Sequence, residues 1–187
     1  MLSAQFSGNE TPLRQPVESV LLNSSSQLRL FGFNNPCLTN PRSCLRIIKI
    51  SMQISLVEAT GSGFLFTTSD YNTSALGFSL FVKDQEIVAI VRTETRVWKA
   101  AGPVQGVVNN FVYVIVEWAY DKKLKLDVGS DSFYGELVLA EHVGRVDETP
   151  STVIKVGGSL DFSIVYVSVT LKEMDESEKI KTVYSGT

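Results

Sequence analysis

The only two cysteines of this 187-residue chain, Cys37 and Cys44, lie close together in the sequence. Six residues separate them, and Pro36, Asn40 and Pro41 favour a turn that returns one sulfur to the other. A disulfide across so short a loop would contribute about 2–2.5 kcal/mol on the chain-entropy model. The spacing excludes a CxxC redox pair, and two cysteines with one distant histidine cannot supply the four ligands of a structural zinc site. We therefore predict a Cys37–Cys44 disulfide, with two free buried thiols as the main alternative.

An acidic run near the C-terminus, Glu173-Met174-Asp175-Glu176-Ser177-Glu178, fits the E-x-D-x-x-E pattern of laminarinase-type glycoside hydrolases. Retaining hydrolysis needs two carboxyl groups about 5–5.5 Å apart across a sugar cleft. In those enzymes the motif lies on a central strand with apolar residues at the intervening positions, where this chain has Glu176 and Ser177. Residues 172–183 carry acidic side chains first and basic ones last, which favours a solvated helix. We therefore expect no catalysis from Glu173 or Glu178.

Other groups of ionisable side chains point to no enzyme either. His142 is the only histidine, and no Ser-His-Asp or Cys-His arrangement can be nominated around it. Calcium prefers oxygen ligands, and four acidic residues in expected loops could offer them: Asp127, Asp131, Asp147 and Glu148. No EF-hand spacing is present, so calcium (Ca2+) stays an alternative without committed ligands, and we expect no other cofactor.

Five aromatic residues are candidates for stacking on a sugar or contacting a protein partner: Tyr71, Trp98, Tyr113, Trp118 and Tyr120. Aromatic residues on the strands of a sandwich more often fill the core. Trp118 shares its expected face with Val112, Val114 and Val116, so we assign it to the core. Trp98 stands beside the Ala100-Ala101-Gly102-Pro103 break, and if it is exposed it is the strongest candidate for a binding residue.

Three N-glycosylation sequons begin at Asn9, Asn23 and Asn72. All three lie in expected turns or loops, where a glycan can be accommodated. Sequons also arise by chance in cytosolic chains, so each is weak evidence alone. Together with the cysteine pair they favour an extracellular protein.

Composition narrows the classes of partner. The net charge is −3, and no basic cluster is longer than Lys122-Lys123, so the concentrated positive surface of a nucleic-acid-binding protein is missing. The longest apolar run, 111–116, is far shorter than a membrane-spanning helix. Residues 1–4 lead directly into polar sequence without the apolar segment of a signal peptide. We therefore expect a cytosolic chain or a mature domain, with no nucleic acid and no membrane insertion.

Alternating polarity indicates the strands that must position these residues. Apolar residues occupy every second position from Ile48 to Leu56, as in a strand with one face in the core. Two hairpins are expected, one within 80–90 and one joining 111–120 to 124–128. Residues 151–156 and 162–171 are predicted to form a last pair around Gly157-Gly158. Short strands at regular spacing indicate a single all-β domain, residues 1–187, with long loops between edge strands in the first 45 residues.

Several segments, in order, resemble the laminin-G/pentraxin-like domains of the concanavalin A-like superfamily, which occur in metazoan extracellular and adhesion proteins. The segments are Gln5–Asn9, the cysteine loop Asn35–Cys44, Gly63–Phe66 with Gly77–Leu80, Phe111–Trp118 with 121–126, and Val156–Ile164. The chain departs from the family's usual pattern at Phe111, Tyr113 and Asp127, so it resembles a divergent member. The family's ligand sites are therefore not transferred to this sequence.

The resemblance implies a two-sheet antiparallel jelly-roll sandwich, to which the charge pattern adds a short C-terminal helix over 172–183. It also implies a non-catalytic, extracellular recognition or adhesion module that binds a protein or glycan at the cell surface or in the matrix. A structural or homo-oligomerising domain is the alternative, and a glycoside hydrolase of the same fold is less expected. Fold alone does not fix function.

Overall fold

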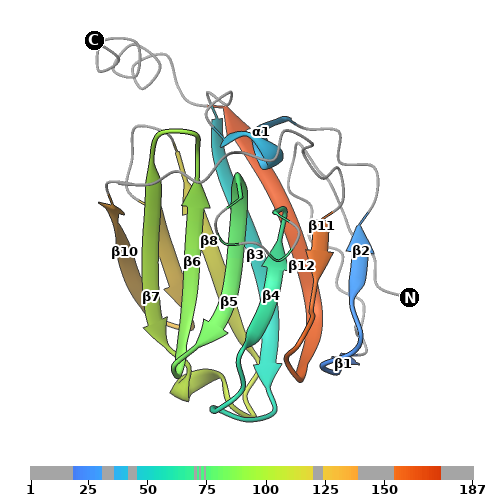
Figure 1. Ribbon diagram of the computed structural model, residues 1–187. Coiled ribbons are helices and arrows are strands. Elements are labelled where there is room, and N and C mark those ends of the chain that lie inside the picture. Colours follow the sequence, from blue (N-terminus) through green and yellow to red (C-terminus); the bar gives the residue numbers. More distant parts are fainter. Residues whose placement is uncertain are drawn as a thin grey trace.

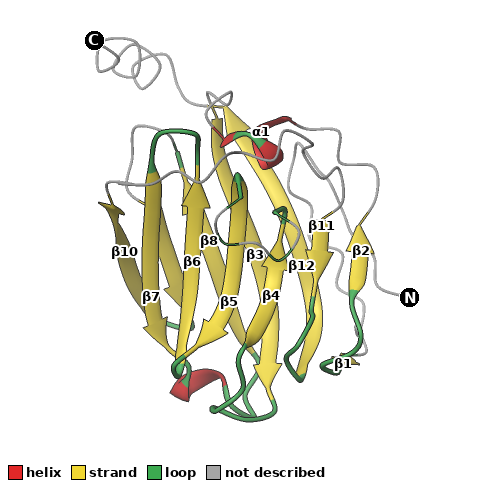
Figure 2. Cartoon of the chain, viewed as in Figure 1, coloured by secondary structure: helices red, strands yellow, loops and turns green. Residues whose placement is uncertain are grey.

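In the computed structural model, the described residues are 19–30, 36–41, 46–69, 71, 73, 75–119, 124–138 and 154–173. They form an all-β structure in which the helical segments α1 (Pro36–Thr39) and η2 (Gln105–Val107) are single turns (Figure 2). No helix among these residues is long and apolar enough to cross a membrane. The all-β prediction is therefore confirmed.

The strands form two antiparallel layers, which Figure 1 shows one behind the other. Sheet A contains, in spatial order, β1 (Val20–Leu22), β12 (Phe162–Glu173), β3 (Arg46–Leu56), β8 (Val112–Trp118), β9 (Leu124–Val128) and β10 (Asp131–Val138). Sheet B continues from β10 through β7 (Val97–Pro103), β6 (Glu86–Arg92), β5 (Gly77–Lys83), β4 (Gly63–Thr67), β11 (Ile154–Val156) and β2 (Leu28–Leu30). The predicted two-sheet sandwich is confirmed, and the N-terminal strands β1 and β2 are its two edges.

Strand β10 belongs to both sheets. Residues 131–135 pair with β9, and residues 136–138 pair with β7. The strand passes from one layer to the other beside Gly135, where an added Cβ would lie 2.7 Å from the backbone oxygen of Lys99. A residue with a side chain would clash there, so glycine permits the close approach that joins the layers.

The space between the sheets is filled by the inward half of each alternating strand. Ile48, Ile50, Met52, Ile54 and Leu56 are all buried, as the alternation along β3 predicts. Their burial removes apolar surface from water and is the main source of stability in such a sandwich.

Both predicted hairpins are present, but the predicted last pair is wrong. The hairpin β5–β6 turns through Asp84 and Gln85, which both have positive φ, and β8 pairs with β9 across the second connection. In contrast, β11 pairs with β2 and β4 in sheet B, whereas β12 pairs with β1 and β3 in sheet A. Gly157 and Gly158 therefore start a connection between the layers, with left-handed backbone angles that glycine adopts without strain.

The predicted C-terminal helix is wrong in its first two residues. Lys172 and Glu173 continue β12 and pair with Ile47 and Arg46 of β3. Residues 174–183 of the predicted helix lie outside the described residues. The charge order that favoured a helix does not account for the pairing energy of a neighbouring strand, which extends β12 through these two positions.

Candidate binding face

The exposed large hydrophobic side chains of the described residues gather on sheet A and the segments that adjoin it. Four of them lie on its strands, on the face turned away from the core: Leu21, Tyr113, Tyr134 and Tyr166. Val57 directly follows β3, and Phe111 directly precedes β8. Apolar groups that gather on one face, and are not scattered singly, mark an interaction surface.

Three neighbouring strands place two of these tyrosines in one row. Tyr166 of β12 pairs with Gln53 of β3, which pairs with Tyr113 of β8. Tyr166 is 39% exposed and Tyr113 is 51% exposed, so both rings reach solvent. We call Tyr166, Gln53 and Tyr113 the tyrosine row.

A β-bulge brings Tyr166 to this surface. The register of β12 against β3 shifts between Ile164 and Tyr166, so Val165 is an extra residue in the strand. Before the bulge the even-numbered residues Phe162 and Ile164 are buried, and after it the odd-numbered residues Val167 and Val169 are buried. Without the extra residue, Tyr166 would point into the core. Bulges re-aim side chains in this way and are frequent next to functional sites.

The ring of Tyr166 is also held in position. Its hydroxyl group donates a hydrogen bond to Oγ of Ser168, two residues along the same face, at 2.5 Å. This bond directs the ring along the strand, so the ring does not swing freely into water. A ring fixed before binding loses less entropy when a ligand stacks on it.

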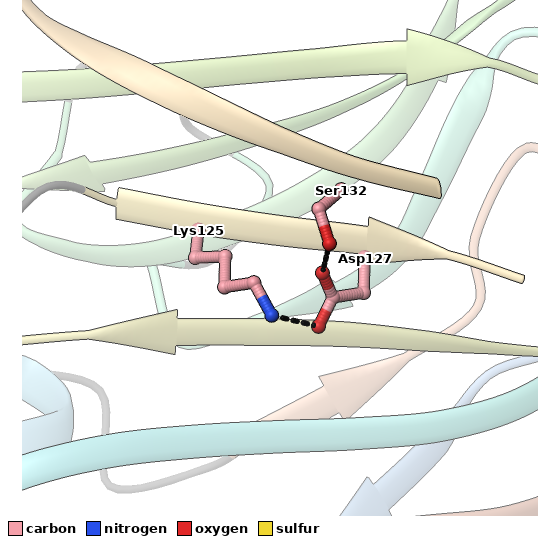
Figure 3. A network of polar contacts seen from close by, with 3 residues as sticks. All are labelled: Lys125, Asp127 and Ser132. Atoms are coloured by element: carbon pink, nitrogen blue, oxygen red, sulfur yellow. Dashed lines mark hydrogen bonds and ion pairs between the residues drawn. The ribbon is translucent and has the colours of Figure 1, made fainter. Parts of the chain in front are cut away.

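Polar contacts continue the face across β9 and β10 (Figure 3). Lys125 Nζ lies 2.8 Å from Asp127 Oδ2, and the Ser132 hydroxyl donates to Asp127 Oδ1 at 2.5 Å. The hydrogen bond to Asp127 is the main reason that the pKa of Lys125 is raised, and burial opposes it. Lys125 therefore stays charged, and its charge is balanced by the carboxylate it contacts.

A hollow of about 270 Å³ lies between the ends of the two sheets, lined by Pro103 of β7, Gly106 of η2 and the core-facing Phe133 of β10. The Gly129 backbone N–H donates to the Tyr113 carbonyl oxygen at 2.9 Å, and Gly129 also lines the hollow. The other residues that line it are Val112, Val128, Ser130 and Asp131. The hollow is large enough for one small polar group with an apolar face.

The outer face of sheet B is closed where the segment between β4 and β5 covers it. The Tyr71 ring contacts the Phe64 ring edge-on, with the centroids 5.3 Å apart, and Lys155 Nζ lies 4.8 Å from the centroid of the Tyr71 ring. The Tyr71 hydroxyl lies 2.6 Å from Gln27 Oε1 and 3.0 Å from the Gly157 carbonyl oxygen. Burial raises the pKa of Tyr71, and the nearby positive charge of Arg29 opposes that shift.

A buried group of hydroxyls lies beside that covered region. Ser69 Oγ is 3.0 Å from Thr67 Oγ1 and 2.9 Å from Ser79 Oγ. All three residues are at most 5% exposed. Because each hydroxyl has a partner, the group satisfies itself and offers little to a ligand.

The structure shows the burial of four of the five aromatic candidates. Trp98 is only 4% exposed and packs edge-on against Trp118, with ring centroids 5.3 Å apart, so it does not meet the condition of exposure set for a binding residue. Trp118 lies in the core as predicted, and Tyr71, in the segment between β4 and β5, is half-buried against Phe64. Tyr113 is exposed, and Tyr120 lies outside the described residues. Sequence alone missed Tyr166, because the alternation along β12 gives no sign of the bulge.

Of the other predicted site residues, several lie outside the described residues: Asn9, Cys44, Asn72, His142, Asp147, Glu148 and Glu178. Cys37 is disulfide-bonded, and Cys44 is the only other cysteine of the chain. Asn23 lies in an exposed turn between β1 and β2, where its Oδ1 accepts a hydrogen bond from the Ser25 hydroxyl at 2.9 Å. Its glycosylation stays a prediction.

The carboxylates do not assemble a metal site in the described part of the chain. Asp127 lies within β9 and Asp131 begins β10, so neither lies in a loop as predicted. No group of three or more potential metal ligands is found among the described residues. Glu173 is the last residue of β12 and is not helical. The predicted helix over 172–183, which was the reason to expect no catalysis from Glu173, is therefore wrong at this residue.

Comparisons with known proteins support the fold. No family model matches the sequence, and no curated protein matches it. Solved structures do match: the receptor-binding domain of the botulinum neurotoxin C/D mosaic serotype has a TM-score of 0.60 and 14% identity, covering 92% of this chain and 44% of the toxin chain. The binding domain of botulinum neurotoxin DC in complex with rat synaptotagmin II has a TM-score of 0.58 and 11% identity, covering 91% and 44%.

A third match is to botulinum neurotoxin type C, whose cell entry is described as dependent upon interaction with two ganglioside molecules. It has a TM-score of 0.58 and 12% identity, covering 91% of this chain and 43% of that chain. This chain therefore spans less than half the length of these proteins. At such low identity the likeness extends to the all-β fold alone. The more specific resemblance to laminin-G domains stays a prediction.

Proposed function

We propose that this chain is a non-catalytic extracellular recognition domain, which binds a partner through the outer face of sheet A. The observation that carries the proposal is the tyrosine row, in which two exposed rings flank an amide on adjacent strands. Exposing two rings to water is unfavourable, so a partner that covers them would recover free energy. The bulge at Val165 and the hydrogen bond from Tyr166 to Ser168 add to this, because both fix a ring at the surface.

The fold neighbours agree with this class of function. Several are described as binding domains, and the ligands named for this group are gangliosides, synaptotagmin II and SialylT. Those proteins are more than twice as long as the match, so their ligands are not assigned to this chain. What the neighbours support is the use of such a sandwich in a protein that contacts a cell surface.

Cell-surface binding of the fluorescently labelled domain, measured by flow cytometry on animal cells, tests the proposal. We expect saturable binding by the wild type and loss of most of it in the double variant Tyr113→Ala/Tyr166→Ala. Gln85→Ala is the control, because Gln85 is exposed in the β5–β6 turn of sheet B, away from this face. Equal binding by the wild type and the double variant, with the same thermal stability, would refute the role of this face.

Two further measurements separate the alternatives. Repeating the binding with and without calcium tests whether the metal takes part. No binding to any surface, together with concentration-dependent self-association in light scattering, would favour a structural, oligomerising module. Hydrolysis of a polysaccharide by the wild type that is lost in Glu173→Gln/Glu178→Gln would favour an enzyme.

A further inference from the structure

The chemistry of the tyrosine row fits a saccharide better than a protein. Its two rings are separated by the amide of Gln53, and the next row across β12, β3 and β8 contains Ser168, Ser51 and Ile115. The Gln53 amide and the Ser51 hydroxyl are half-buried and reach solvent, whereas Ser168 is buried and holds the Tyr166 hydroxyl. The amide and the Ser51 hydroxyl suit the many hydroxyl groups of a sugar, which act as both donors and acceptors. The apolar face of a pyranose carries C–H groups that pack against the negative face of an aromatic ring.

The spacing of the rings sets the length of the ligand. Tyr166 and Tyr113 stand on strands separated by β3, so their backbones are about 10 Å apart at the usual strand spacing. That distance suits rings that stack on alternate sugars of an extended chain, with Gln53 facing the sugar between them. A single sugar would cover one ring only, so binding should depend strongly on chain length.

The charges on this face indicate an uncharged saccharide. The tyrosine row contains no ionisable side chain apart from its phenols. Two rows away, Lys49 pairs in register with Glu117, which in turn pairs with Lys125, and Lys125 contacts Asp127. Positive and negative groups therefore balance one another, and nothing on the row would compensate for removing a sulfate or carboxylate from water.

We infer that the tyrosine row is a binding site for a neutral, extended oligosaccharide of at least three sugar units. The inference rests on the proposed function, because it names the ligand class of the same face. The Tyr166 and Tyr113 rings stack on the outer two sugars, and Gln53 exchanges hydrogen bonds with the middle one.

The test is a calorimetric titration of the intact chain with neutral oligosaccharides of one to four units, from the glucose, N-acetylglucosamine and galactose β-linked series. We expect at least one series in which affinity rises about tenfold or more from one unit to three. Tyr113→Ala and Tyr166→Ala should each lower the affinity for the trisaccharide about tenfold. Tyr166→Ala should also remove the gain with length, because one ring remains.

Two controls keep the outcome specific. Tyr134→Ala removes an exposed tyrosine two rows away on the same face and should change the affinity less than twofold. Sialyllactose and a heparin tetrasaccharide form the anionic arm, and tighter binding of either than of every neutral chain would overturn the inference. Equal affinity of the wild type and both row variants for a neutral chain would also overturn it.

The experiments distinguish an error in the proposed saccharide ligand from an error in the proposed binding face. If no oligosaccharide binds while Tyr113→Ala/Tyr166→Ala still abolishes cell-surface binding, the face recognises another class of partner and only the saccharide inference falls. If the double variant binds cells as the wild type does, both proposals fall. Enzymatic removal of glycans from the cells gives the same distinction, since only a saccharide ligand would be lost.

Discussion

The outer faces of the two sheets are built by the same alternation but end in opposite environments. On sheet B, Val88 is 4% exposed, and the Ser69 hydroxyl is buried between two other hydroxyls. On sheet A, Tyr113 and Tyr134 are more than half exposed, and the ion pair of Lys125 and Asp127 meets solvent. A covered face contributes to stability, whereas an open face that keeps aromatic rings is available for binding. The two sheets have the same strand pattern, so they differ in function because the outer face of sheet B is covered and that of sheet A is open.

The largest expected difference in stability between the two faces comes from introducing a carboxylate on each of them. Val88→Asp should lower the free energy of unfolding by at least about 3 kcal/mol, because an unpaired carboxylate would be buried on β6. Tyr134→Asp is the matched change on sheet A and should shift it by about 0.5 kcal/mol or less. Urea denaturation followed by circular dichroism measures both. Equal losses would show that the two faces are not different in the way the structure indicates.

Removing a hydroxyl group from each face should again destabilise the protein more on sheet B than on sheet A, but by a smaller amount. Ser69→Ala leaves Thr67 and Ser79 without a shared partner in a buried site, so we expect a loss of about 1–3 kcal/mol. Ser132→Ala removes an exposed hydroxyl that contacts Asp127, and should cost about 0.5 kcal/mol or less. The midpoints of urea unfolding compare the pair. A Ser132→Ala loss as large as that of Ser69→Ala would contradict the comparison.

The Tyr71 hydroxyl tests how firmly sheet B is covered. It lies near two acceptors, Gln27 and Gly157, but has one proton to donate, so Tyr71→Phe should cost about 1 kcal/mol. Burial raises the pKa of Tyr71 above its ordinary value of 10.0, so the folded state favours the neutral phenol. This stabilisation is fully present below pH 10.0 and is lost as the pH rises through the higher pKa of the folded state. Unfolding of the wild type and Tyr71→Phe at pH 9 and pH 11, with the difference shrinking at pH 11, would bear this out.

The smallest effect is expected at the ion pair on sheet A. Asp127→Asn removes the charge that holds Lys125 but leaves an oxygen for the Ser132 hydroxyl, so we expect a loss of about 0.2–1 kcal/mol. Added salt should reduce the difference from the wild type, because it screens exposed charges. Thermal unfolding at low and high salt measures it, and a large loss that salt does not change would mean that this face is buried after all.

The alternation of polar and apolar residues correctly predicted individual strands and hairpins, which depend on neighbouring residues. The alternation from Ile48 to Leu56 predicted a strand because one face of β3 is in the core, and the turn residues between β5 and β6 predicted their hairpin. Pairing between distant segments could not be predicted in this way: residues 154–156 and 162–173 follow each other in sequence but enter opposite sheets. Nearness in sequence, on which the predicted pair depended, does not decide which layer a strand joins.

The candidate site was predicted less well, for two physical reasons. Burial of Trp98 depends on Trp118, which comes from another strand in the other sheet, so its sequence neighbours could not decide it. The outward position of Tyr166 depends on one extra residue, Val165, which alternation does not reveal because both sides of the bulge are apolar. Tyr113 was among the candidates because it is aromatic, but its exposure required the fold.

The order of strands in sheet A has a consequence for the synthesis of the chain. β3 lies between β8 and β12. One edge of β3 therefore pairs with a strand from the middle of the sequence, and the other edge pairs with β12, which is synthesised much later. Because synthesis starts at the N-terminus, β3 leaves the ribosome before β12 has been synthesised. During that interval an apolar strand with an unpaired edge is available to any neighbouring chain. A chaperone that bound β3 during synthesis would shield this edge until β12 has emerged.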